Sequence, residues 1–209
     1  YVSTARGHSF QMGGARGASL FVRARVRNEL SLPDSLAGVV GSDRSTDEVI
    51  GRVQGYLPVD GPGFASHVFA VRGTFGVAHG PGADIGYFDV GGASGSGETV
   101  TGTNLFGGSP IFLPLRGYRT SIRSGRYAWS ASAEYRVPLA LFNWGLGAWP
   151  LHFDRVFGSV FADAGNAWGP DASPSGFANV RRDPLVSVGA EITAQVLTFY
   201  RVSMRVRTG

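Results

Sequence analysis

Cysteine and lysine are both absent from the sequence, and charged residues are scarce. Without cysteine, the chain has no disulfide framework, no thiolate metal site and no cysteine nucleophile. Charged residues make up 16% of the 209 residues, whereas typical globular domains have about 25%. Apolar runs are short as well, and none approaches the ~18 residues that a membrane-spanning helix requires. The sequence therefore predicts neither a disulfide scaffold nor a helical membrane span.

Glycine, aromatic residues and arginine are the components in excess. The chain has 32 glycines, an aromatic content of 12%, and 19 basic residues that are all arginine; with 15 acidic residues the net charge is +4. A nucleic-acid-binding protein concentrates such charge in a run or on one face. Here the arginines are spread along the whole chain. No nucleic acid partner is therefore expected, and the spacing of the arginines is more informative than their number.

The arginines alternate with apolar residues at the period of a β-strand. Successive side chains of a strand point to opposite faces, so residues 19–30 predict a strand with one apolar and one charged face. The same alternation predicts strands over residues 47–57, 67–77, 127–139, 156–168, 185–196 and 200–208, and a weaker one over 1–11. Ile50 departs from the pattern in 47–57. The chain is expected to be all-β. In residues 19–30 the alternating residues are Leu20, Val22, Ala24 and Val26 on one side and Arg23, Arg25, Arg27 and Glu29 on the other.

The lengths of the strands and their connections favour a transmembrane antiparallel β-barrel. Several strands reach roughly 10–14 residues, as tilted barrel strands require, whereas globular strands average about 5–6. Short connections at 12–18 and 59–66 alternate with long ones at 31–46, 78–126 and 169–184, as short periplasmic turns alternate with long outer loops in such barrels. Residues 140–155 are expected to form an intermediate connection, whose aromatic residues suit a membrane interface. A soluble β-sandwich with uneven loops is the alternative, because alternation alone does not say what covers the apolar face.

Patterns typical of enzymes and cofactor sites are missing. The four histidines, at positions 8, 67, 79 and 152, form no pair at metal-ligand spacing on one element. No Gly-x-Ser-x-Gly segment lies at a strand-to-helix turn. The glycine-rich segment at 91–95 is not followed by a helix that could hold a phosphate. We expect no catalytic residue, no metal ligand and no cofactor.

Four short segments occur in an order typical of one protein family. Leu-Arg-Gly-Tyr at 115–118 closes the longest connection, and Ser-Ala-Glu-Tyr-Arg-Val-Pro-Leu at 132–139 follows on the next strand. Phe-Ala-Asp-Ala-Gly at 161–165 and Ser-Val-Gly-Ala-Glu at 187–191 come on later strands. This order resembles the bacterial surface antigen family of outer-membrane barrels, whose loop motif is Val/Leu-Arg-Gly-Phe/Tyr and whose strand motif is Phe-x-Asp-x-Gly. The resemblance covers most of residues 66–209. Phe-Asp-Val-Gly-Gly at 88–92 and Pro-Leu-His-Phe-Asp-Arg at 150–155 are similar to a subgroup with an upstream Tol-type β-propeller.

The resemblance implies a site inside the barrel. In the family, the long loop folds back into the lumen and its arginine meets the aspartate of the strand motif. Carried over, Arg116 would pair with Asp163, and Glu134 would be a second acceptor. Both carboxylates fall on the polar faces of their strands. The other motif residues are Gly117, which permits a positive φ or a close approach, Tyr118, which would lie in the lumen, Phe161 and Gly165.

The resemblance also implies the setting of the chain. Family barrels have about 16 strands, so residues 1–209 would be the C-terminal part of a barrel, about eight strands, with residues 80–126 as an inward-folded loop. The expected location is the bacterial outer membrane, and the expected partners are its lipid, a polypeptide substrate and the remainder of the same chain. The implied function is protein translocation or membrane-protein insertion, without enzymatic activity. The alternatives are a passive pore that mildly favours anions and a soluble β-sandwich that binds a ligand through its loops.

Overall fold

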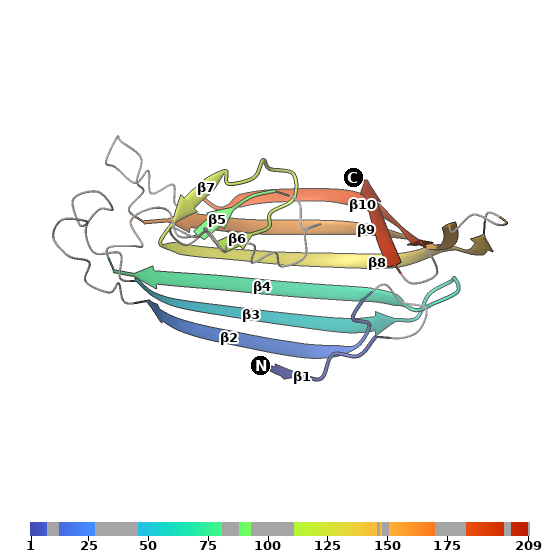
Figure 1. The fold of residues 1–209 in the computed structure, drawn as a ribbon, viewed down its shortest axis with the longest axis horizontal. Coiled ribbons are helices and arrows are strands. Elements are labelled where there is room, and N and C mark those ends of the chain that lie inside the picture. The colour runs from blue at the N-terminus through green and yellow to red at the C-terminus, as the bar shows by residue number, and fades with distance from the viewer. Residues whose placement is uncertain are drawn as a thin grey trace.

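Eight strands form one antiparallel sheet in the order β1-β2-β3-β4-β8-β9-β10-β11 (Figure 1). The structure, a computed structural model, describes residues 1–7, 13–27, 46–80, 88–92, 111–145, 147, 151–169, 183–198 and 202–208. The all-β class and the antiparallel pairing predicted from the sequence are confirmed. No described segment forms a helix long and apolar enough to cross a membrane. The strands of this sheet are β1 (Val2–Ser3), β2 (Gly17–Arg27), β3 (Thr46–Val59), β4 (His67–His79), β8 (Tyr127–Gly145), β9 (Leu151–Trp168), β10 (Leu185–Thr198) and β11 (Val202–Thr208).

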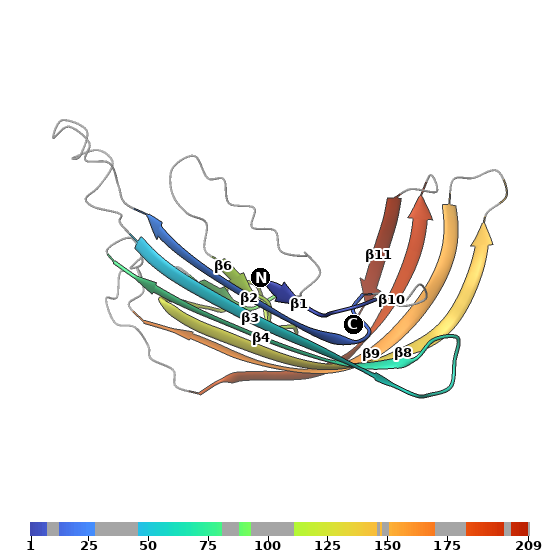
Figure 2. The same ribbon diagram turned by 90° about the horizontal axis from the view of Figure 1, so that it is seen from below.

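The sheet is curved and open. Figure 2 shows the long strands bending around a concave side. The outermost strands, β1 and β11, pair only with β2 and β10 among the described strands, so these strands do not close into a barrel. The curvature nevertheless gives the sheet two distinct faces.

Apolar side chains cover the convex face and are exposed there. The pairing register sets them side by side across neighbouring strands, as with Leu20 opposite Val53 and Phe69 opposite Tyr135. Val188 has 78% of its surface exposed, and Ile192 has 51%. No described element therefore covers this face. Its exposed members include Leu20, Val22, Val49, Val53, Leu57, Phe69, Val71, Phe75, Val77, Val160, Val186, Val188 and Ile192.

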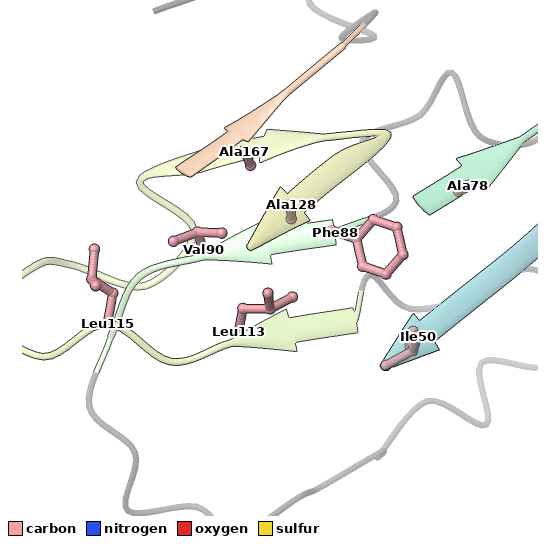
Figure 3. Packing of buried hydrophobic residues seen from close by; sticks show 8 residues of the cluster. All are labelled: Ile50, Ala78, Phe88, Val90, Leu113, Leu115, Ala128 and Ala167. Atoms are coloured by element: carbon pink, nitrogen blue, oxygen red, sulfur yellow. The ribbon is translucent and has the colours of Figure 1, made fainter. Parts of the chain in front are cut away.

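A second, smaller sheet lies on the concave side. It consists of β5 (Phe88–Val90), β6 (Ile111–Leu113) and β7 (Arg123–Gly125), in the order β6-β5-β7. β5 pairs with β6 in parallel and with β7 antiparallel. Its apolar side chains pack onto a patch of small residues on the large sheet and form the main buried cluster (Figure 3). The cluster contains Ile50, Ala78, Phe88, Val90, Leu113, Leu115, Ala128 and Ala167.

This small sheet explains two departures from the sequence predictions. Residues 80–126 were expected to form a loop, and the described part contains three short strands that the alternation did not reveal. Three-residue strands are too short to show a period of two, which is why the pattern missed them. Ile50 departs from the alternation because it faces the concave side beneath the small sheet, where only 5% of its surface is exposed.

The prediction of a connection over residues 140–155 is wrong. β8 extends to Gly145 and β9 begins at Leu151, so both strands are longer than expected. Their pairing shifts register between Pro138 and Ala140 and again between Leu141 and Trp144. A β-bulge inserts an extra residue and so interrupts the alternation of faces. The apolar pattern therefore stops at 139 although the hairpin continues.

The weak strand over residues 1–11 is also largely wrong. Only Val2–Ser3 forms a strand in its described part, and Arg6 adds an isolated bridge to Arg16. Residues 8–12 lie outside the described residues. The strand predicted over 19–30 is present as β2 up to Arg27, and residues 28–30 are likewise outside the described part.

Gly76 provides a direct test of how the small sheet docks. A Cβ atom at this position would lie 2.4 Å from Cε1 of Phe88 and 2.6 Å from its Cζ. Phe88 is fully buried in the main cluster, so a shift of its ring would disturb the packing around it. We expect Gly76→Ala to destabilise the docked loop by about 1–3 kcal/mol, as overpacked cores usually do. Limited proteolysis of the folded protein measures this: cleavage near Arg116 should be slow in the wild type and faster in the variant.

Gly73→Ala is the matched control. Gly73 lies on the same strand, and the nearest atom to its added Cβ would be Cγ1 of Val53 at 3.4 Å, which is ordinary contact. This variant should leave the cleavage rate unchanged. Equal cleavage in both glycine variants would mean that β5 does not pack against β4.

Candidate functional site

The backbone of the loop places Arg116 beneath the small sheet. Arg116 follows β6, and the preceding Leu115 forms a bridge to Gly92 and is fully buried. Gly117 then adopts a φ of 81°, a conformation that other residues rarely adopt. A Cβ atom on Gly117 would lie 3.2 Å from Cβ of Ser187 on β10. The loop is thus fixed on both sides of Arg116.

Three carboxylates face Arg116 from three adjacent strands. Glu134 lies on β8, Asp163 on β9 and Glu191 on β10, which are neighbours in the sheet. The register sets Ser132 opposite Asp163. All these side chains point to the concave face. Residues paired across neighbouring strands point to the same side of a sheet, and so do residues two apart on one strand. The alternation predicted from the sequence puts each of them on the polar face of its strand, and the register between the strands brings them together.

Arg116 satisfies all of its side-chain donors within this group. Its Nε donates to Oδ2 of Asp163 at 2.7 Å, and one terminal nitrogen donates to Oδ1 of the same carboxylate at 2.7 Å. The other terminal nitrogen donates to Glu134 at 2.9 Å and to Glu191 at 3.2 Å. Ser132 Oγ accepts the remaining bond at 2.9 Å. A guanidinium has five N–H donors, and each of them has an acceptor here.

Of the remaining motif residues, Phe161 contacts the Arg116 side chain, and Tyr118 and Gly165 lie close by. The ring of Phe161 lies 3.6 Å from the guanidinium carbon, a cation–π contact. Tyr118 donates a hydrogen bond to the backbone oxygen of Val186 at 2.8 Å. A Cβ atom on Gly165 would lie 2.9 Å from the backbone oxygen of Trp129. Each sequence-predicted site residue therefore lies in or beside this cluster, and the contact expected between Arg116 and Asp163 is present.

Hydrogen bonds and opposite charges hold the cluster in its ionised form although it is buried. Arg116 and Asp163 each have 3% of their surface exposed. Burial alone lowers the pKa of Arg116, but the hydrogen bond with Asp163 and the charges of the three carboxylates outweigh it, so the pKa is raised above its ordinary value. Arg136 adds a second cation, because its Nε donates to Glu134 at 2.6 Å. The negative charge of the three carboxylates is thereby largely compensated.

The geometry of the cluster suits mechanical attachment of the loop. The carboxylates that could ligate a metal are bonded to Arg116, and the described residues contain no group of side chains arranged to hold a metal ion. Removing Arg116 would take from Asp163, Glu134 and Glu191 the cation that they share. The cluster therefore ties the loop to β8, β9 and β10 at once.

Two residues that hold the loop were not assigned this role from the sequence. The sequence placed Glu191 on the polar face of its strand but assigned it no partner. In the structure Ser187, four residues before Glu191, pairs with Asp163, so both acidic side chains point to the same face. Asp89 was named only as part of the segment at 88–92 and was given no role. It accepts hydrogen bonds from Ser121 at 2.8 Å and from Ser124, which join β5 to the return segment of the loop. The spacing of Asp89, Ser121 and Ser124 in the sequence does not predict these hydrogen bonds.

Comparison with models of known protein families finds no match, and a search of curated proteins finds no match either. The likeness to the surface antigen family therefore rests on the sequence motifs alone.

Proposed function

We propose that the chain is part of a transmembrane β-barrel of the bacterial surface antigen superfamily. It would lie in the outer membrane and act without enzymatic activity in polypeptide translocation or membrane-protein insertion. The convex face would meet lipid, and the concave face would line the lumen. In this arrangement the loop of residues 80–126 lies inside the barrel.

One observation supports this proposal above the others: the exposed face of the sheet is the apolar one. A soluble sandwich buries its apolar face against a second sheet, whereas an outer-membrane barrel turns that face to lipid and keeps polar residues inside. Here the small sheet packs on the opposite, concave side, and large side chains such as Val188 remain exposed. A β-sandwich is therefore disfavoured.

The free edges of the sheet support a larger barrel. β1 and β11 each lack a second partner among the described strands. Unpaired backbone groups at such edges are too costly in lipid, which is why membrane sheets close. We propose that further strands of the same chain pair with these edges.

The loop separates the proposed function from a passive pore. Its small sheet lies on the concave side (Figure 2), where it would narrow a lumen. The buried Arg116 cluster holds the loop there. A passive pore needs a lumen that is always open, whereas a translocation or insertion barrel needs one that opens while it handles a polypeptide. The attached loop therefore favours the first proposal over a passive pore.

Depletion of the full-length protein in the bacterium that makes it tests the function. The proposal expects a loss of folded outer-membrane proteins or of a secreted polypeptide, restored by the wild-type gene. A normal outer-membrane protein profile and normal secretion, combined with a large steady conductance in planar bilayers, would instead identify a pore.

A further inference from the structure

A small polar cavity lies beside the Arg116 cluster on the concave face. It has a volume of about 120 Å³ and lies between β3, β4 and β8. At ~30 Å³ for each water molecule, this is room for about four waters, or for a small oxyanion in their place. Its polar lining residues are Gln54, Tyr56, Arg72, Ser132, Glu134 and Arg136.

Arg72 is the unusual member of this lining. Arg23 forms an ion pair with Glu48 at 3.1 Å, and Arg116 satisfies every donor. Arg72 faces Ser132 across the strand pair, but within the described part of the chain it makes no hydrogen bond or ion pair. It is half-buried, so its charge is only partly solvated. The charges of Asp163 and Glu134 act on Arg72, but neither carboxylate forms an ion pair with it among the described residues, and Arg116 and Arg52 repel its charge.

The other lining groups also leave donors unused. Arg136 bonds Glu134 through Nε, and its two terminal nitrogens make no hydrogen bond to the described residues. The Oε1 atom of Gln54 accepts hydrogen bonds from Ser19 at 3.4 Å and from Tyr56 at 3.2 Å. The amide nitrogen of Gln54 has no acceptor in the described ranges. Three neighbouring side chains therefore offer free N–H donors to one cavity.

The acidic residue of the lining does not compete for these donors. Both carboxylate oxygens of Glu134 are engaged, Oε1 by Arg136 and Oε2 by Arg116. Asp163, on the next strand, is likewise bound through both oxygens by Arg116. The cavity thus combines two arginines and one neutralised carboxylate, an arrangement that favours an anion.

We propose that Arg72, Arg136 and Gln54 form a binding site for an oxyanion, a carboxylate or a phosphate group. The planar fork of Arg72 matches the paired oxygens of either group. Free phosphate and the acidic side chain of a polypeptide share this chemistry. The assignment of a polypeptide side chain as the ligand rests on the proposed function, whereas the binding of an oxyanion does not.

Binding is measured on the full-length protein in detergent micelles, so it requires neither lipid nor transport. Inorganic phosphate is titrated at fixed chloride concentration and followed by calorimetry, and N-acetyl-aspartate amide is titrated separately. The wild type should bind phosphate saturably. Arg72→Gln should weaken binding about tenfold or more, because a charged hydrogen-bonding partner is lost. Arg72→Lys keeps the charge but loses the fork, and it should give a smaller loss.

Arg119→Gln is the matched control. It makes the same change of charge on an exposed loop residue outside the cavity, so it should leave the phosphate affinity unchanged. Heat-modifiable mobility shows that each variant is folded. Competition by N-acetyl-aspartate amide would assign the site to acidic side chains, and binding of phosphate alone would assign it to a free anion. Absence of saturable binding, or equal affinity in folded Arg72→Gln and wild type, would overturn the proposal.

Discussion

Replacement of Arg116 by alanine should destabilise the docked loop by about 3–5 kcal/mol, as expected when one partner of a buried ion pair is removed. The variant leaves Asp163, Glu134 and Glu191 facing one another without their shared cation. Only 3% of the surface of Arg116 is exposed, so its contacts with the carboxylates are shielded from bulk water. Heat-modifiable mobility and chemical unfolding of the lipid-folded protein measure the loss. The same cost is expected between about pH 6 and 8, because arginine stays charged there.

Asp163→Ala should cost less than Arg116→Ala. Arg116 would keep Glu134 and Glu191 as acceptors, whereas Arg116→Ala takes the shared cation from three carboxylates, of which Glu134 keeps Arg136. The double variant should cost less than the sum of the two single variants, because contacting residues are not additive. Arg119→Ala, an exposed arginine of the same loop, is the control and should have little effect. A cost for Arg116→Ala no larger than that control would show that the cluster does not hold the loop.

Replacement of Ile192 by arginine should cost about 2–4 kcal/mol in lipid, the range for a charged residue on the lipid face of a barrel near the membrane midplane. Ile192 lies near the middle of β10, and 51% of its surface is exposed on the convex face. Folding into bilayers at graded urea concentrations measures the cost. The same substitution at Thr193, whose side chain faces the opposite side, should cost less because a polar lumen tolerates charge.

The penalty at Ile192 distinguishes lipid from water around the convex face. In a soluble protein an exposed arginine would be harmless or would improve solubility. An intact protein that is monodisperse without detergent, and that accepts arginine at Ile192 without loss of stability, would rule out the lipid-facing assignment.

Much of the fold follows from one property of the sequence, the alternation of apolar and polar residues. Alternation needs several residues to show itself, so it predicted β2, β3, β4, β8, β9, β10 and β11 but missed the three-residue strands of the loop. It also ended at Leu139, because the bulges in the β8–β9 pair reset the phase. The closed barrel was a further expectation, and the described strands form an open sheet.

The site was predictable in part for a different reason. Motif resemblance pointed to Arg116, Asp163 and Glu134, and alternation put the two carboxylates on one face. The distances that bring Glu191 and Ser132 into the same group depend on the register between strands, which a single sequence does not reveal. That Arg72 makes no ion pair or hydrogen bond among the described residues could not be found in advance, since it becomes visible only when the neighbouring side chains are placed.

The absence of cysteine allows a direct test of the central claim, that the convex face meets lipid and the concave face does not. Single cysteines placed in turn along β10 (Leu185–Thr198) can carry a fluorophore in the full-length protein, reconstituted in bilayers that contain brominated lipid. The account predicts strong quenching at Val186, Val188, Ala190 and Ile192 and weak quenching at Ser187, Gly189 and Thr193. Uniform quenching, no quenching, or the opposite alternation would contradict it.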